Sequence, residues 1–125
     1  MLTRFRPMID RTKKLPARFY ESSTGAKPVR DWILELGVSD RHAIGKDIQK
    51  VEFGWPIGRP HCAALGEGLW EVRSSLDSNR IARVIFCLGD GHMILLHAFI
   101  KKTQITPQQD IDLALKRKSE VTRWP

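Results

Sequence analysis

Apolar residues after position 27 recur with the spacing of two consecutive amphipathic helices. The first predicted helix carries its apolar face at Val29, Trp32, Ile33 and Leu36. Pro28 suits its first position, and Gly37 suits the residue after its end. The second predicted helix, with Ser39 as its N-cap, carries its apolar face at Ile44, Ile48 and Val51. Because the link between the two helices is very short, we expect them to pack as an antiparallel hairpin.

The second half of the chain changes from helical spacing to patterns typical of β-strands. Residues 70–73 alternate between apolar and polar, as in a half-buried strand. Residues 81–88 and 93–100 are richer in apolar and β-branched side chains, and the Gly-Asp-Gly at 89–91 predicts a hairpin turn between them. Residues 18–21 predict a short first strand.

The last predicted element is a helix with a clear start. Thr106 is expected to be its N-cap, Pro107 its first residue, and Gln109 the partner in a capping box. Its apolar face is Ile111, Ala114, Leu115 and Val121. The predicted order is β-α-α-β-β-β-α. This order indicates an α+β fold with a mostly antiparallel sheet, an N-terminal helical hairpin and a C-terminal helix.

The length and charge of the chain restrict its organisation and its partners. A length of 125 residues suits one domain, which we predict to span 15–125 after a basic arm over 1–14. The formal net charge is +7, and the excess lies at the two ends. Residues 1–18 hold six basic residues and one acidic residue, and residues 101–125 hold six and three. This distribution favours an anionic partner such as nucleic acid, although it also serves solubility.

Several classes of protein are excluded by what the sequence lacks. No run approaches the 18 apolar residues of a membrane span, and the first residues lack the apolar stretch of a secretory signal. Cys62 and Cys87 have the spacing of neither a metal site nor a disulfide scaffold, and we expect reduced core side chains. The histidines are scattered without a metal-binding motif: His42, His61, His92 and His97. We expect a cytoplasmic protein without metal, cofactor or membrane contact.

Polar side chains on the predicted strands fall on one face of the sheet. Glu71 and Arg73 point away from the apolar positions of their strand, because side chains alternate in direction. Antiparallel neighbours would add Arg83, Lys101, Lys102 and His97 to the same surface. Two interpretations stay open: a basic site, or a solvated face on which Glu71 pairs with an arginine across the strands.

Three stretches carry a more specific signal: 68–73 (GLWEVR), 80–83 (RIAR) and 95–107 (LLHAFIKKTQITP). They closely resemble the phage-derived HigB-like branch of the RelE/ParE toxin superfamily. The resemblance covers roughly residues 18–121, and the first dozen residues look like an extension. It implies a small RelE-like domain and a toxin of a type II toxin–antitoxin pair.

The resemblance also implies a chemistry: a ribosome-dependent mRNA endonuclease in which the ribose 2′-OH attacks the adjacent phosphate without a metal. Such a reaction needs positive charge at the phosphate, a proton acceptor and a proton donor. The side chains expected to take part are Arg73, Arg83, Lys101, Lys102, His97 and Glu71. By this resemblance the arginines would clamp the phosphate, the lysines would bind the RNA backbone, and the histidine and glutamate are candidates for proton transfer.

The end of the last predicted helix holds further candidate RNA-binding residues: Lys116, Arg117 and Lys118. Cations at that position also favour the helix dipole, so they have a structural use that needs no ligand. The partners that the resemblance implies are mRNA on the ribosome and a helix-turn-helix antitoxin, through which alone the toxin would reach operator DNA.

Other functions are compatible with the same fold. The alternatives are a gyrase poison, an inactive relative, and a module that only binds nucleic acid. Phe86 departs from the family pattern, because we expect many relatives to carry tyrosine there, and a phenol therefore cannot act from this position.

Overall fold

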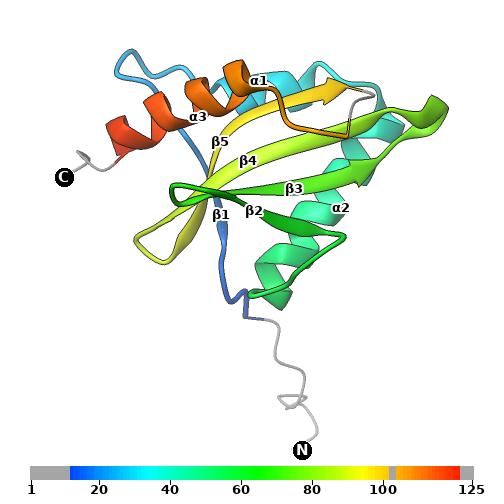
Figure 1. Ribbon diagram of the computed structural model, residues 1–125, viewed down its shortest axis with the longest axis horizontal. Helices are drawn as coiled ribbons and strands as arrows, with labels where there is room; N and C mark the ends of the chain where they lie inside the picture. The colour runs from blue at the N-terminus through cyan, green and yellow to red at the C-terminus, as the bar shows by residue number, and fades with distance from the viewer. Residues whose placement is uncertain (1–11, 102–103, 122–125) are drawn as a thin grey trace, which may run out of the picture.

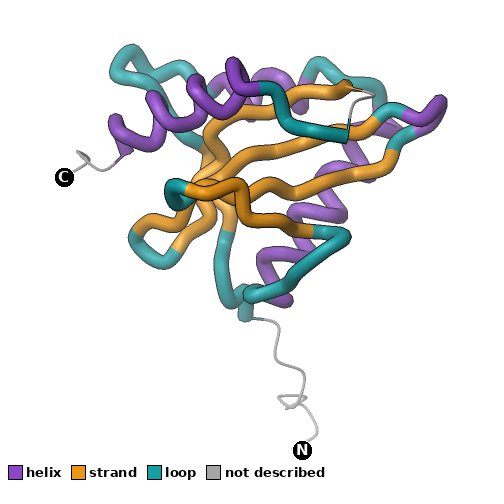
Figure 2. Tube along the Cα trace, in the orientation of Figure 1, coloured by secondary structure: helices purple, strands orange, loops and turns teal. Residues whose placement is uncertain are grey.

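A computed structural model describes residues 12–101 and 104–121, which form a five-stranded sheet with helices on both faces (Figures 1 and 2). The elements in chain order are β1 (Ala17–Phe19), α1 (Pro28–Leu34), α2 (Val38–Gly54), β2 (Cys62–Gly66), β3 (Leu69–Ser75), β4 (Ile81–Gly89), β5 (His92–Lys101) and α3 (Gln108–Val121). The predicted α+β class is confirmed.

The sheet has the order β1-β5-β4-β3-β2, and all its neighbours are antiparallel except β1 and β5. The predicted first strand is present, and it pairs in parallel with β5 at the edge of the sheet. The opposite edge, β2, is a strand that the sequence pattern did not predict. The turn between β4 and β5 is confirmed, and Asp90 and Gly91 both adopt positive φ angles, as tight hairpin turns require.

Alternation along the central strands sorts the apolar side chains into two cores. Val84, Phe86 and Leu95 face α1 and α2, where Ile44 and Val51 are fully buried against them. On the other face, α3 covers the second core: Tyr20, Leu69, Ile85, Cys87, Ile94, Leu96, Phe99, Ala114 and Val121. Burial of each large aliphatic side chain contributes roughly 1.5–3 kcal/mol, and these contacts hold the helices to the sheet.

Two helix starts differ from the predicted ones. Helix α2 begins at Val38 with Gly37 as its N-cap, so the predicted capping role of Ser39 is wrong. Helix α3 begins at Gln108, because the carbonyl of Pro107 accepts the N–H of Ile111. Thr106 therefore lies outside the helix, one residue before the cap.

The first two helices lie on the same face of the sheet, α1 against β5 and α2 against β3. Their packing as an antiparallel hairpin stays a prediction. No helix in the described part of the chain is long and apolar enough to cross a membrane.

The predicted basic arm lies outside the described residues except for 12–14. At its end, the N–H groups of Lys14 and Leu15 donate to the carbonyl of Glu52 on α2, at 2.8 and 3.0 Å. The start of the described chain is thus held against α2. The division of the chain at residue 15 stays a prediction.

Candidate functional site

Five members of the predicted site lie on the sheet face that α3 covers, near the start of that helix. Glu71 and Arg73 come from β3, Arg83 from β4, and His97 and Lys101 from β5. The register places Arg73 directly opposite Arg83. Lys102 lies outside the described residues, so its predicted place beside this group is not described.

His97 reaches this face because β5 contains a bulge. Pairing shifts from Ile85–His97 to Phe86–Leu95, which leaves Leu96 without a partner across the strands. Strict alternation would put Leu96 and His97 on opposite faces. The extra residue turns both toward α3, and bulges often redirect a side chain in this way.

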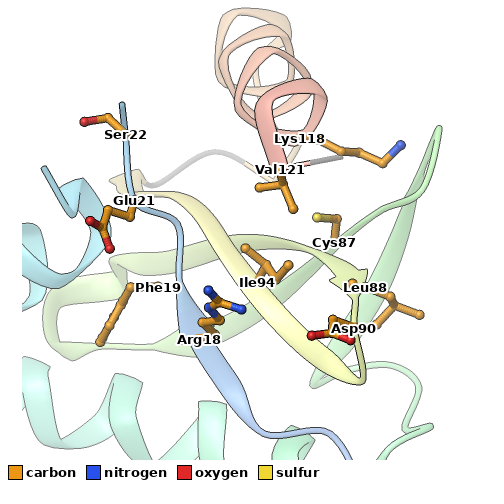
Figure 3. A pocket seen from close by; sticks show the side chains of 11 residues that line it. Arg18, Phe19, Glu21, Ser22, Cys87, Leu88, Asp90, Ile94, Lys118 and Val121 are labelled. Carbon is orange, nitrogen blue, oxygen red and sulfur yellow. The ribbon is translucent and has the colours of Figure 1, made fainter. Parts of the chain in front are cut away.

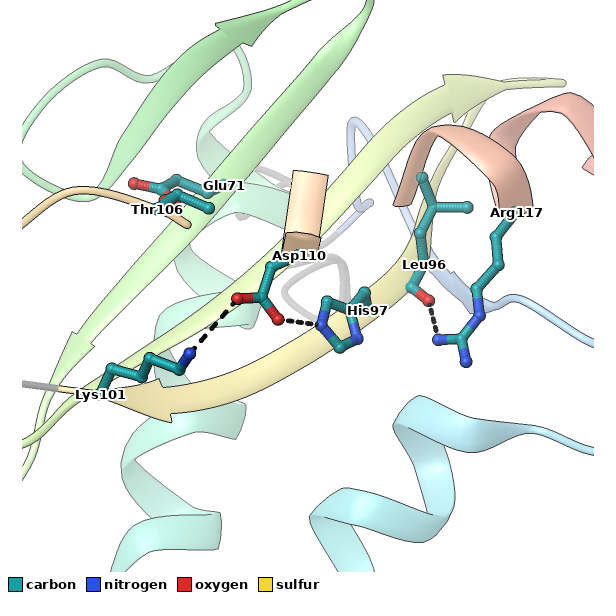
Figure 4. Close-up of polar contacts among 7 residues, drawn as sticks. All are labelled: Glu71, Leu96, His97, Lys101, Thr106, Asp110 and Arg117. Atoms are coloured by element: carbon teal, nitrogen blue, oxygen red, sulfur yellow. Dashed lines mark hydrogen bonds and ion pairs between the residues drawn. The ribbon is translucent and has the colours of Figure 1, made fainter. Parts of the chain in front are cut away.

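The imidazole of His97 is held by Asp110 in the first turn of α3. Its Nε2 lies 2.7 Å from Oδ1 of Asp110, and Nζ of Lys101 lies 3.7 Å from Oδ2 (Figure 4). Asp110 is buried, His97 is mostly buried, and Lys101 is partly exposed. With Nε2 occupied by the carboxylate, Nδ1 is the nitrogen that can exchange a proton with a bound molecule.

Sequence reasoning did not assign Asp110 to the site. An aspartate in the first turn of a helix is expected for its favourable interaction with the helix dipole, so the residue carries no separate signal of a catalytic contact. Its partner, His97, is thirteen positions away on another element. Only the docking of α3 across β5 brings the two together.

Glu71 is buried between two guanidinium groups. Its Oε2 lies 3.9 Å from Nε of Arg73 on the same strand, and its Oε1 lies 3.8 Å from Nε of Arg83 on the next strand. Like charges directly opposite each other destabilise a sheet, and the carboxylate offsets this repulsion. Glu71 pairs with an arginine across the strands, as the second interpretation predicts, but both side chains are buried, so this part of the face is not solvated.

Arg83 is completely buried, with 0% of its side chain exposed. Its Nη2 donates to the carbonyl of Gln104 at 2.7 Å, and the hydroxyl of Thr106 donates to Oε1 of Glu71 at 2.5 Å. Burial lowers the pKa of Arg83, and the charge of Glu71 opposes this shift. Of the two opposed arginines, only Arg73 reaches solvent, with 23% of its side chain exposed.

The three basic residues near the end of α3 do not share one surface. Lys116 is exposed, whereas Nη1 of Arg117 donates to the carbonyl of Leu96 at 2.7 Å (Figure 4). The guanidinium of Arg117 also lies over the ring of Tyr20. Burial lowers the pKa of Arg117. Arg117 thus fixes α3 to the sheet, and an RNA-binding role for this cluster stays a prediction.

A pocket of about 710 Å³ lies beside Lys118 and Val121, at the C-terminal end of α3 (Figure 3). It is lined by Arg18, Phe19, Glu21, Ser22, Cys87, Leu88, Gly89, Asp90, Ile94, Lys118 and Val121. Its charges are mixed, with two cations and two carboxylates, and its thiol is buried. The pocket therefore lacks the excess positive charge that a phosphate site needs.

Neither cysteine has the character of a nucleophile. Both thiols are buried and unpaired, as the sequence predicts. Burial raises the pKa of Cys62 to about 11 and also raises the pKa of Cys87. Both are therefore protonated at neutral pH, whereas the thiolate is the reactive form.

Position 86 is remote from the site. Phe86 is fully buried on the face of the sheet that carries α1 and α2, with its ring 5.9 Å from that of Trp55. A tyrosine at this position would not face Arg73 or His97. The presence of phenylalanine instead of tyrosine at position 86 therefore takes no side chain away from the candidate site on the sheet face that α3 covers.

The arrangement suits chemistry at a phosphate group. It combines exposed or partly exposed cations with an imidazole oriented by a carboxylate, the elements that charge stabilisation and proton transfer require. Within 12–101 and 104–121, no three His, Cys, Asp or Glu side chains converge as they would around a metal ion.

Comparison with known proteins identifies one family. Residues 31–119 match the family described as Phage derived protein Gp49-like (DUF891). The match covers most of the chain and includes every described residue of the group on the α3 face. No curated protein matches the sequence. The chain belongs to the Gp49-like phage-derived family, a RelE/toxin-like family of toxin–antitoxin systems.

Proposed function

We propose that this protein is the toxin of a type II toxin–antitoxin pair, from the HigB-like branch, and that it cleaves mRNA on the ribosome. Membership of a toxin-like family supports the first part. The observation that carries the second is the imidazole of His97, held 2.7 Å from Asp110 beside Lys101. Arg73, partly exposed on the neighbouring part of the sheet, adds a cation with forked donors.

The proposed reaction uses the RNA's own 2′-OH as the nucleophile. The 2′-oxygen bonds to the adjacent phosphorus, the bond from phosphorus to the 5′-oxygen breaks, and the products are a 2′,3′-cyclic phosphate and a 5′-hydroxyl. Nδ1 of His97 accepts the proton of the 2′-OH, and Lys101 supplies a proton to the departing 5′-oxygen. Arg73 stabilises the additional negative charge on the phosphorane, which is greater than in the substrate.

The proposed partners follow from the charge of the chain and its family. An mRNA in the ribosome offers phosphates to the basic residues, with a salt-dependent affinity. A helix-turn-helix antitoxin would bind the toxin and connect it to operator DNA. A nucleic-acid module without catalysis would share the salt dependence but would leave RNA intact.

Primer extension on mRNA after induced expression tests the proposal. The wild type should produce new 5′ ends and growth arrest. His97→Gln should reduce cleavage by about 100-fold, the usual contribution of general acid–base catalysis. Arg73→Gln should reduce it by a similar factor, because it removes the charge that stabilises the phosphorane. His92→Gln is the matched control, because His92 lies at the start of the same strand and contacts Asp90.

Other outcomes identify the alternatives. Cleavage by His97→Gln at the wild-type rate would contradict the assignment of His97. Growth arrest with intact mRNA and damaged DNA would indicate a gyrase poison, and the absence of arrest would indicate an inactive relative.

A further inference from the structure

Arg83 has an unusual environment for a charged side chain. It is fully buried, yet its Nε and Nη1 have no hydrogen-bond partner among the described residues. Oε1 of Glu71 lies 3.8 Å from Nε of Arg83, beyond hydrogen-bond distance. Buried guanidinium donors that lack acceptors are costly, and in a native protein they call for an explanation.

One short segment, residues 104–106, contacts both buried side chains, Arg83 and Glu71. Between β5 and α3, the carbonyl of Gln104 accepts from Nη2 of Arg83 at 2.7 Å, and the hydroxyl of Thr106 donates to Glu71 at 2.5 Å. Ile105 between them is 79% exposed, so it buries little apolar area to hold the segment in place. The two hydrogen bonds tie this segment to the buried side chains of the sheet.

We propose that Arg83 is a concealed phosphate site, occupied in the free protein by the carbonyl of Gln104 and opened when RNA displaces residues 104–106. This inference rests on the proposed function and adds to it a means of regulating access to the site. A phosphate offers two oxygens and a negative charge to a guanidinium whose Nε and Nη1 have no acceptor, whereas the carbonyl offers one neutral oxygen. Release of Thr106 also leaves the Glu71 carboxylate able to accept a proton.

The concealed site predicts an unusual response to mutation. The apparent affinity for RNA is reduced by the fraction of molecules that are open. Weakening the contact between Thr106 and Glu71 destabilises only the closed state, in which that contact exists. RNA binding should then become tighter, whereas loss of a contact that merely supports the site would weaken it.

The first experiment needs no RNA. Thr106→Val removes the hydroxyl and keeps the shape of the side chain, and Thr106→Ser keeps the hydroxyl as the matched control. Phenylglyoxal, which modifies guanidinium groups, would be applied to each folded protein, and the modification of Arg83 would be followed by peptide mass mapping with Arg73 as the internal reference.

We expect roughly tenfold faster modification of Arg83 in Thr106→Val, the effect of one charge-assisted hydrogen bond, and the wild-type rate in Thr106→Ser. Equal rates in all three proteins would overturn the concealment. Thr106→Ala replaces Thr106→Val if the valine variant fails to fold.

The second experiment measures the affinity of each protein for ribosomes that carry an mRNA unable to react, because its 2′-OH at the cleavage position is replaced by hydrogen. Tighter binding by Thr106→Val than by the wild type supports the inference, and weaker or equal binding overturns it. If Arg83 becomes accessible in Thr106→Val but no protein binds the mRNA-carrying ribosomes, then RNA is not the occupant, and the proposed endonuclease itself is wrong.

Discussion

Nε2 of His97 and Oδ1 of Asp110 lie 2.7 Å apart across the contact between β5 and the first turn of α3. The position of the imidazole therefore depends on the docking of a helix, as well as on the strand that carries it. Arg117, seven residues further along α3, reinforces this docking by donating to the carbonyl of Leu96. The helix thus holds two neighbouring residues of the bulged strand, Leu96 through its carbonyl and His97 through its ring.

Removing the charge of Asp110 should impair cleavage without unfolding the protein. Asp110→Asn keeps the shape of the side chain, but it can no longer stabilise a protonated imidazole, so cleavage should fall by at least about tenfold. Asp112→Asn is the matched control, since Asp112 is exposed on the same helix and accepts a hydrogen bond from Gln108 at 2.8 Å. Cleavage by Asp110→Asn at the rate of Asp112→Asn, measured by primer extension, would contradict a positioning role.

The sequence pattern was sufficient for those parts of the site that depend on local periodicity. Glu71 and Arg73 share a face because they are two positions apart on one strand, and the structure has them so. The direction of His97 depends on a bulge at Leu96, and no composition rule identifies where a strand of apolar residues takes an extra position. The burial of Arg83 could not be predicted either, since it depends on how residues 104–106 fold back over the sheet.

The same distinction, between local periodicity and contacts made only in the folded protein, explains which elements of the fold were predicted wrongly. The faces of α1 and α2 follow from helical spacing and were predicted correctly. Strand β2 was missed because 62–66 is short and holds alanine and glycine rather than β-branched residues, so its pairing with β3 defines it. Thr106 resembled a helix cap because serine and threonine are favoured there, but its hydroxyl is engaged by Glu71.

A bidentate ion pair should make stability depend on pH in acid. Arg80 donates from both terminal nitrogens to Asp40 at 2.8 and 3.0 Å, which connects α2 to the segment before β4. The hydrogen bonds from Arg80 hold the pKa of Asp40 below its ordinary value of 3.8. Because the folded pKa is depressed, the stabilisation is present above that value and is lost as the pH falls through the folded pKa.

Arg80→Gln should therefore melt below the wild type at neutral pH, and the difference should disappear as the pH falls below 3.8 and through the depressed pKa of Asp40. Thermal denaturation at a series of pH values measures this. Arg30→Gln is the control, since its pairing with Asp31 at 3.6 Å is exposed and should contribute almost nothing. A difference between Arg80→Gln and the wild type that stays constant with pH would contradict the assignment.

Glu52 should be important for holding β1 against the rest of the domain. Its buried carboxylate accepts the N–H of Ala17 at 2.6 Å and the ammonium of Lys13 at 3.1 Å. Glu52→Ala leaves a backbone donor at the sheet edge without its acceptor and should lower the free energy of unfolding by about 1–3 kcal/mol. Lys13→Ala removes only the exposed partner and should cost less than about 1 kcal/mol. Urea unfolding measures the free energy of unfolding of both variants. Equal losses would show that the hydrogen bond from Ala17 to Glu52 does not contribute to stability beyond the ion pair with Lys13.

Two glycines with open surroundings should respond in opposite directions to the same substitution. An added Cβ would meet nothing within 4 Å at either Gly45 or Gly66, so packing does not distinguish them. Gly45 lies inside α2, where alanine has the higher helix propensity, and Gly45→Ala should stabilise the protein by about 0.5–1 kcal/mol. Gly66 has a φ of +94°, a conformation that alanine adopts only with strain, so Gly66→Ala should destabilise by about 1 kcal/mol or more. Chemical denaturation of both variants measures the difference, and a shift in the same direction for both would contradict the backbone conformation at the bulge between β2 and β3.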